Sequence, residues 1–317
     1  MELDLTNTRF DNEIRLLANG DEFDSSDIKS CLAQTIKTSK LFMQSITDIL
    51  HITIVVPVYG EHNRAKSKEE HVNGESFVTR KIAQMKWLVD TNPNVTWDIL
   101  FVDDGCENES GRIIQTILED TKLTSNVDVL FYNNKKSKKG GAVLHGIKHS
   151  LSSDIIIYTD ADMSAHLGQC GNLIRPLIES DSIMSIGNRL DPISISGNGV
   201  FTIPKEIDDV YRTREQVRKT RFPSIAAISD TQCGFKAFNV KKCIPAIHQM
   251  QSIDDIFDIE LLVRVAKLGT ISEIPLIWLW SRCESNFYNP TSDKQTQINE
   301  YLHTTQRIIT LSNTIHI

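Results

Sequence analysis

Four short apolar runs alternate with amphipathic stretches in the first half of the chain. The runs are rich in β-branched residues and occupy 52–59, 97–105, 127–134 and 154–162. Continuous apolar runs of this length are typical of strands buried on both faces of a parallel sheet. Between them, apolar residues recur at helical spacing in 77–90, 110–121 and 142–151. This alternation predicts βαβ units, and therefore an α/β fold whose mostly parallel central sheet carries helices on both faces.

The regions on either side of these units are less regular. Residues 1–50 have cap-like residues and apolar positions at helical spacing, which predicts a helical N-terminal appendage to a domain at 51–317. In the second half, the pattern predicts strands at 181–190 and 270–280 and helices at 210–222 and 254–269.

Composition narrows the class of protein. The 317 residues are 40% hydrophobic and 24% charged, as in soluble globular proteins, and the net charge of -7 argues against binding to nucleic acid. The six cysteines are scattered without a C-x-x-C pair, which indicates reduced thiols in a cytoplasmic protein. We expect no signal peptide, because no basic stretch precedes an apolar core at the N-terminus, and no transmembrane segment, because the longest apolar run is 274–280.

Polar or glycine-containing sequences follow the four predicted strands of the first half. They are 57–61, 103–105, 135–141 and 160–162. In an open α/β sheet, ligands bind outside the carboxyl ends of the strands. Four such ends along one edge of the sheet predict a binding site there.

The carboxylates of Asp160 and Asp162 are the most informative of these groups. Strand side chains alternate between faces, so residues two apart point the same way and can converge if the strand continues through them. A pair of carboxylates with substrate phosphates is a common ligand set for Mg²⁺ or Mn²⁺. A solvated turn is the alternative for an isolated D-x-D, but its position after a buried strand favours a metal site.

Two further strand ends have both a structural and a functional interpretation. Asp103 begins a turn, or it accepts hydrogen bonds from a base or ribose. The basic loop 135–141 is an exposed loop, or it binds an anion at the start of a helix. It lacks the spacing of a P-loop, and no G-x-G-x-x-G follows the first strand, which argues against a typical dinucleotide oxidoreductase.

Seven motifs, in this order along the chain, resemble one known family. They are VVPVYGE, FVDDG, KKGGAVLHGI, YTDADMS, IGNRL, DTQCGFKAF and FDIELLVRVAKLG, within residues 52–285. The chain resembles glycosyltransferase family 2, and within it the dolichyl-phosphate glucosyltransferase-like branch of polyprenyl-phosphate sugar transferases. The resemblance implies a GT-A fold, with the nucleotide-sugar-binding half at 51–165 and the acceptor-binding half at 166–317.

The resemblance also implies roles on the nucleotide side. The residues expected to contact the nucleotide sugar are Pro57, Tyr59, Glu61, Asp103, Lys139 and Asp160. Asp162 would bind the divalent metal that bridges the diphosphate. Such a cation neutralises the negative charge that grows on a departing nucleoside diphosphate.

On the acceptor side, the resemblance implies a loop beneath the donor sugar that contains Asp230, Gln232 and Lys236. Asp258 would be the catalytic base if the acceptor is a hydroxyl, whereas a phosphate acceptor is already ionised near neutral pH and needs no strong base. An alternative for Asp258 is a carboxylate that stabilises a helix end. Arg189 and Arg282 would pair with a phosphate, although a single arginine is more often part of an ion pair.

The implied activity is a metal-dependent, inverting transfer of a sugar from a nucleoside-diphosphate sugar, with a UDP-sugar preferred and GDP-mannose second. The segment at 210–229 carries four arginines where lipid-phosphate transferases are apolar. The acceptor is therefore left as a polyprenyl phosphate reached at the membrane surface, or a soluble, possibly anionic molecule. A nucleotide-sugar-binding protein without turnover and a nucleotidyltransferase remain the alternatives, and a homo-oligomer is possible.

Overall fold

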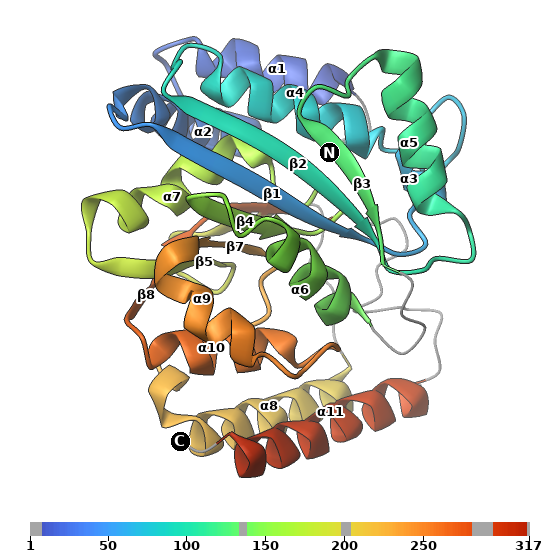
Figure 1. Ribbon diagram of the computed structural model, residues 1–317, viewed down its shortest axis with the longest axis vertical. Coiled ribbons are helices and arrows are strands. Elements are labelled where there is room, and N and C mark those ends of the chain that lie inside the picture. The colour runs from blue at the N-terminus through green and yellow to red at the C-terminus, as the bar shows by residue number, and fades with distance from the viewer. Residues whose placement is uncertain (1–7, 133–137, 198–203, 281–293, 316–317) are drawn as a thin grey trace.

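The computed structural model describes residues 8–132, 138–197, 204–280 and 294–315 (Figure 1). A seven-stranded sheet with the order β3-β2-β1-β4-β7-β5-β8 lies at its centre. Its strands are β1 (Leu50–Val58), β2 (Val95–Asp103), β3 (Val127–Phe131), β4 (Ile155–Thr159), β5 (Ser182–Asn188), β7 (Phe235–Asn239) and β8 (Thr270–Pro275). Two short parallel strands, β6 (Ile195–Gly197) and β9 (Ile277–Leu279), form a second sheet.

All neighbouring strands of the main sheet run parallel except at β7, which is antiparallel to both β4 and β5. The mostly parallel α/β fold that the sequence predicts is thus confirmed. The reversal of β7 has a geometric consequence. Its first residue, Phe235, pairs with Thr159, the last residue of β4. The segment before β7 therefore lies at the carboxyl edge of the parallel strands.

Eleven α-helices lie in the part of the chain that the structure describes. They are α1 (Thr8–Ala18), α2 (Ile28–Ser45), α3 (His62–Ala65), α4 (Phe77–Val89), α5 (Ser110–Thr121), α6 (Lys139–His149), α7 (Cys170–Glu179), α8 (Lys205–Arg221), α9 (Val240–Gln249), α10 (Phe257–Ala266) and α11 (Lys294–Thr314). Two short 3-10 helices cover Leu167–Gln169 and Pro223–Ile225.

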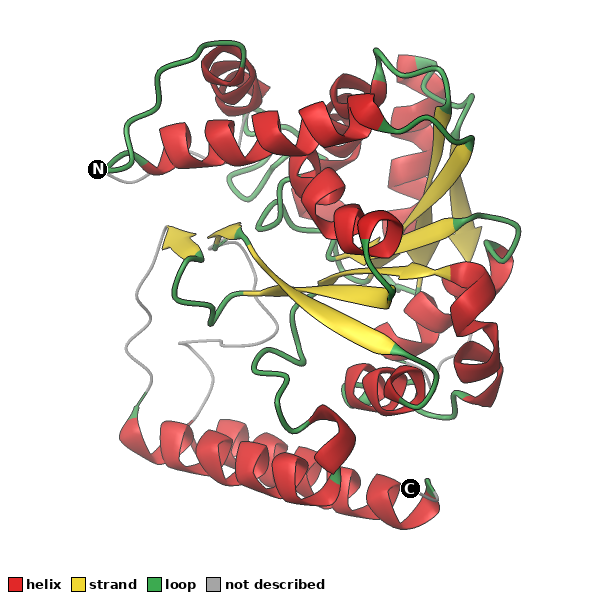
Figure 2. Cartoon of the chain, turned by 90° about the vertical axis from the view of Figure 1, so that its left-hand side faces the viewer, coloured by secondary structure: helices red, strands yellow, loops and turns green. Residues whose placement is uncertain are grey.

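Alternation along the strands produces two hydrophobic layers. In β1, Ile52, Ile54 and Val56 face α2, α4, α5 and α7, whereas Val55 faces the layer formed by α6, α9 and α10. These side chains are fully buried, and burial of one such aliphatic chain stabilises the fold by about 1.5–3 kcal/mol. Helices α8 and α11 pack side by side outside the second layer (Figures 1 and 2).

The region before β1 forms α1 and α2, and both pack onto the sheet-bearing part of the chain. Phe10 and Ile14 of α1 share a buried cluster with Ile36 of α2 and with Ile277 and Leu279 of β9. Their apolar faces thus have partners on the rest of the chain. The division into an appendage at 1–50 and a domain at 51–317 stays a prediction.

Three local boundaries differ from the sequence prediction. β4 ends at Thr159 and does not continue through Asp162, because the Asp162 carboxylate accepts a hydrogen bond from the Ser164 backbone N–H and so favours a turn. The stretch at 270–280 divides into β8, which pairs in the main sheet, and β9, which pairs with β6. The loop that follows β1 contains α3.

Candidate active site

The carboxyl ends of β1, β2 and β4 meet at one edge of the sheet, and four of the predicted site residues, which are named below, lie there. β1 and β2 end in register, with Val58 opposite Asp103. Asp160 and Asp162 follow β4, and Lys139 begins α6. The edge therefore gathers acidic and basic side chains from segments that are far apart in the sequence.

Asp160 forms an ion pair with Lys139, the first residue of α6. Partial burial alone would lower the pKa of Lys139, but the charges of Asp160, Asp258 and Asp162 outweigh that effect and raise it. Gly234 makes room for this carboxylate, because a Cβ at that position would lie 2.2 Å from Asp160 Oδ2. The Asp160 backbone N–H also donates to Gly234 O at 3.1 Å.

The backbone of Asp162 is in contact with the buried amine of Lys81, a residue of α4. Lys81 is 0% exposed, and its Nζ donates to the Asp162 backbone carbonyl at 2.9 Å. Burial lowers the pKa of Lys81 to about 8, while the charges of Asp162, Asp160 and Glu75 oppose that decrease. Asp162 is thus held through its backbone, and its carboxylate remains partly exposed to solvent.

Glu61 faces the same two aspartates from the loop after β1. Burial raises the pKa of its carboxyl to about 7, and the charges of Asp162, Glu75 and Asp160 add to the increase. Arg64 opposes the shift through an ion pair with Glu61 at 2.7 Å. Burial is thus the main cause of the raised pKa, and the neighbouring carboxylates make a smaller contribution.

Asp103 serves a structural purpose in this geometry. Its Oδ1 accepts a hydrogen bond from the Cys106 N–H at 2.9 Å, and its Oδ2 accepts one from the Gly111 N–H at 2.6 Å. Both oxygens thus hold the turn that leads into α5. Of the other residues predicted to border a base, Pro57 is buried within β1, and Tyr59 is 61% exposed.

Asp258 lies at the start of α10 in contact with Lys236 and Tyr158. Lys236 Nζ is 2.6 Å from Asp258 Oδ1 and 2.7 Å from Tyr158 Oη, and the Tyr158 hydroxyl also bonds to the carboxylate. All three side chains are buried. Burial, followed by the charge of Asp258, raises the pKa of Tyr158 well above its usual value. The predicted base is therefore one partner of a buried ion pair.

The segment before β7 contains the remaining predicted residues. Asp230 forms a two-point ion pair with Arg189, at 2.7 Å to Nε and 2.8 Å to Nη2. The Arg189 guanidinium also lies over the rings of Trp278 and Trp280, at 5.1 and 5.7 Å from their centroids. Gln232 Nε2 is buried and has no hydrogen-bond partner within the described residues. Arg282 lies outside the described residues.

The structure thus brings Lys139 within electrostatic range of Asp160, Asp162 and Asp258, and Glu61 within range of Asp160 and Asp162. Lys236 contacts Asp258 from within the strand β7. It is therefore not part of a loop, contrary to the sequence prediction.

Sequence reasoning did not identify Lys81 or Tyr158. Lys81 lies in an amphipathic helix, where a lysine usually reaches solvent, and Tyr158 reads as part of an apolar strand. Their contacts join segments 81 and 100 residues apart. The nearest sequence signal is the consecutive polar pair Arg80–Lys81 within an otherwise apolar helical stretch.

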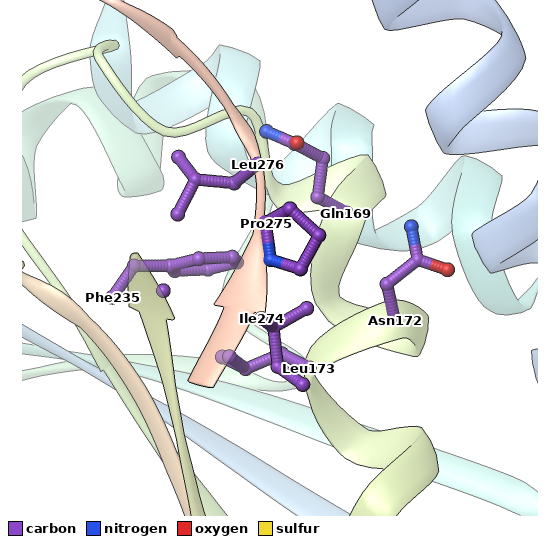
Figure 3. Close-up of a pocket in the computed structure, with 8 residues that line it drawn as sticks. Gln169, Asn172, Leu173, Phe235, Ile274, Pro275 and Leu276 are labelled. Carbon is purple, nitrogen blue, oxygen red and sulfur yellow. The ribbon is translucent and has the colours of Figure 1, made fainter. Parts of the chain in front are cut away.

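A small, mostly apolar pocket lies beside β8 (Figure 3). Figure 3 shows the Leu173 and Asn172 side chains of α7 opposite Ile274 and Pro275. None of the predicted site residues lines it. It carries no group suited to holding a phosphate or a cation.

The fold and the strand-end site define a class, the nucleotide-sugar transferases with a GT-A fold. The solved structure of glucosyl-3-phosphoglycerate synthase from Mycobacterium tuberculosis, in complex with Mn²⁺, UDP and phosphoglyceric acid, superimposes with a TM-score of 0.56. It is 13% identical, and the alignment covers 89% of this chain and 84% of that one. The likeness confirms the predicted fold.

The family follows from sequence comparison. The profile of glycosyl transferase family 2 matches residues 53–242, so the chain belongs to this family. A dolichyl-phosphate beta-glucosyltransferase of Trichomonas vaginalis is 26% identical over 240 residues, which cover 72% of this chain and 66% of that protein. The dolichyl-phosphate beta-glucosyltransferase of Saccharomyces cerevisiae is 24% identical over 240 residues, with coverage of 72% and 67%. The chain thus spans about two thirds of the length of these relatives.

These results confirm the predicted family and enzyme class, a glycosyltransferase. Among the helices that the structure describes, none combines the length and the apolar character needed to cross a bilayer.

Proposed function

We propose that this protein transfers glucose from UDP-glucose to a polyprenyl phosphate, with inversion at the anomeric carbon. The observation that carries the proposal is the acidic edge at Asp160, Asp162 and Glu61, flanked by the ammonium groups of Lys139 and Lys81. The relatives named above as dolichyl-phosphate glucosyltransferases support the donor sugar and the acceptor. GDP-mannose is the second donor.

A divalent cation fits this edge on the chemistry of its donor groups. Carboxylate oxygens are the ligands that Mg²⁺ and Mn²⁺ prefer, and the carboxylates of Asp160 and Asp162 lie close enough to Glu61 to add to the rise in its pKa, whose main cause is burial. The described residues contain no cluster of three His, Cys, Asp or Glu suited to a metal. Asp162, with Asp160, would therefore hold the cation together with the diphosphate, and the cation would supply charge neutralisation at the leaving group.

The protein's own groups would place the donor. Lys139 stands beside Asp160 at the start of α6, where its ammonium group and the positive end of the helix dipole favour a phosphate. The buried, unpartnered Nε2 of Gln232 supplies a hydrogen-bond donor two residues before Gly234. An amide in that state favours a ligand hydroxyl as its partner.

Asp258 favours a phosphate acceptor over a hydroxyl. Its carboxylate is buried and paired with Lys236, so its negative charge is already stabilised before an acceptor arrives. Its Oδ1 already bonds to Lys236 Nζ and to the Tyr158 hydroxyl, which leaves less of the carboxylate open to an incoming hydroxyl. A phosphate is ionised near neutral pH and attacks without losing a proton to the protein. In this role Asp258 would orient groups at the acceptor end instead of removing a proton.

A soluble phosphomonoester is the second candidate acceptor. The helix α8, which precedes the 230–236 segment, is strongly charged, and Arg214 and Arg218 are buried within its packing. Such a segment offers little apolar surface for a lipid chain, since only Val210, Tyr211 and Val217 are partly exposed apolar residues in it. The comparison of acceptors therefore belongs in the first experiment.

That experiment measures UDP release from UDP-glucose with Mn²⁺, supplied with dolichyl phosphate or with a soluble phosphomonoester. Asp162→Asn should abolish release, because the cation loses its carboxylate. Asp154→Asn is the matched control, since Asp154 caps the other end of β4 by accepting the His51 N–H at 2.8 Å. Equal release by both variants would contradict the proposal. Tight nucleotide binding without release would indicate a regulatory binding protein, and pyrophosphate release when UTP and glucose 1-phosphate are supplied instead would indicate a nucleotidyltransferase.

A further inference from the structure

The helix α1 places a charged side chain inside the protein. Asp11 is 0% exposed, and its carboxylate accepts two hydrogen bonds from Arg80 of α4, at 2.7 Å from Nε and 3.1 Å from Nη2. Gln84 Nε2 donates a third, at 3.0 Å. A buried carboxylate is tolerated only where partners of this kind satisfy it. Asp11 also lies outside residues 53–242, which the family profile matches.

The partners of Asp11 reach the segment that follows β4. Gln84 Oε1 accepts a hydrogen bond from the Leu167 backbone N–H at 3.0 Å, so one amide joins α1 to that segment. His166 Nε2 lies 3.6 Å from Asp11 Oδ1, and His166 Nδ1 accepts the Gly168 N–H at 2.9 Å. All of these side chains are buried.

The same segment is anchored nearer to the carboxylates. Lys81, one residue after Arg80 in α4, donates to the Asp162 carbonyl at 2.9 Å. The Ser164 carbonyl accepts the Leu279 N–H of β9 at 2.9 Å. Residues 160–167 are thus tied to α4 at two points and to β9 at a third. Because β9 and α1 share one buried cluster, α1 packs against both elements that hold this segment, α4 and β9.

A second branch of contacts leads from α1 to Glu61. Arg80 Nη1 donates to the Glu75 carbonyl at 3.2 Å, and the Glu75 carboxylate pairs with Arg64 at 3.2 Å. Arg64 in turn pairs with Glu61 at 2.7 Å. The arginine that holds Asp11 therefore also supports the third carboxylate of the acidic edge.

We propose that α1 is a positioning element of the active site, in which Asp11 acts through Arg80 and Gln84 to fix residues 160–167 and the carboxylates of Asp160 and Asp162. This role rests on the proposed function, since it assigns a metal and a diphosphate to those carboxylates. Residues that orient metal ligands from behind commonly change metal affinity by about 10- to 100-fold when replaced. The helix thus contributes to the site without touching a ligand.

The test uses the full-length chain with Gln84→Met, which removes both hydrogen bonds of the amide and keeps its length. Asp11→Leu is the second variant. The matched control is Asn92→Leu, because Asn92 is also buried and its Nδ2 donates to the carbonyls of Met43 and Ile46 at the end of α2, away from residues 160–167.

The first measurement is amide hydrogen exchange in the metal-free protein. Exchange across residues 160–168 should be about tenfold faster in Gln84→Met than in the parent and unchanged in Asn92→Leu. The second measurement is the Kd of Mn²⁺ in the presence of UDP, which should rise about tenfold in Gln84→Met and stay within about twofold in the control. Unfolding by urea, followed in parallel, separates these local effects from a general loss of stability.

Unchanged exchange in Gln84→Met, or an equal increase in Asn92→Leu, would overturn the positioning role. A parent protein that binds neither UDP nor Mn²⁺ would instead refute the proposed function, and the exchange result would then decide alone whether α1 holds the segment. Because Gln84→Met also breaks the Leu167 contact directly, an Asp11 variant has to show the same two effects; if Asp11→Leu does not fold, Asp11→Asn, which keeps the shape of the side chain, gives both measurements.

Discussion

Replacing Gly234 by alanine is the most direct perturbation of the acidic edge, because it adds one methyl group beside Asp160. The added Cβ would lie 2.2 Å from Asp160 Oδ2 and 2.4 Å from its Cγ. Since carbon and oxygen atoms settle well beyond 3 Å, the carboxylate has to move by about 1 Å. Gly234 does not have a positive φ, so the effect is steric and not a matter of backbone strain.

A displacement of this size has a definite expected effect on catalysis. Misplacement of a positioned group by about 1 Å costs about 10²-fold in rate, which corresponds to about 2.7 kcal/mol in the activation barrier. We therefore expect Gly234→Ala to lower kcat/KM for UDP-glucose by about 10²-fold. The ion pair with Lys139 should be disturbed at the same time.

The assay is UDP release with Mn²⁺ at a temperature where the variant is folded, judged by circular dichroism. Gly171→Ala is the matched control, since its Cβ would lie 2.4 Å from the Ser39 carbonyl at the α2–α7 contact. Both variants should lose stability by about 1–3 kcal/mol through overpacking. Full activity of Gly234→Ala, or an equal loss in Gly171→Ala, would refute the role of Gly234 in placing Asp160.

Three further predictions follow from the charged groups. The variant Glu61→Gln should become more stable relative to the parent as pH rises from about 4.5 to 7. The reason is that the folded parent binds the Glu61 proton more tightly than the unfolded chain does, and the parent loses this stabilisation across that pH range. Urea unfolding at several pH values should show a relative gain in the free energy of unfolding of up to about 3 kcal/mol at pH 8. A flat difference would contradict the raised pKa. Lys236→Met should destabilise the fold by about 3–5 kcal/mol by leaving Asp258 buried and unpaired, and the double variant with Asp258→Leu should recover much of that loss in the same assay; strictly additive losses would exclude the coupling. Removing divalent cations with EDTA should weaken UDP binding in calorimetry at least tenfold, with recovery on addition of Mn²⁺, and unchanged affinity would exclude a bridging cation.

The sequence was a good guide where one physical effect dominates. The apolar run at 52–59 has no other low-energy arrangement than a strand buried on both faces, and β1 occupies Leu50–Val58. Such runs also predict the succession of parallel strands along the chain. The sequence could not show that β7 runs antiparallel, because DTQCGFKAFN has the same local preferences in either direction.

The site was predictable in its acidic residues and less so in their partners. The position of Asp160 and Asp162 after a buried run identified the edge, but the turn preference of aspartate ended β4 before them. The pairing of Asp258 with Lys236 could not be anticipated, since a helix-end aspartate and a strand lysine each have common surface roles. Contacts of this kind depend on tertiary packing across the two halves of the chain.

The reversed direction of β7 has a further consequence for how this scaffold can diversify. Because its start lies at the carboxyl edge of the parallel strands, the segment 223–234 reaches that edge from upstream, whereas the turns after β1, β2 and β4 leave their strands downstream. Under the proposed function, insertions or deletions in that segment would reshape the acceptor end without altering the register of the parallel strands. One donor-binding frame would in this way serve chemically different acceptors over the course of evolution.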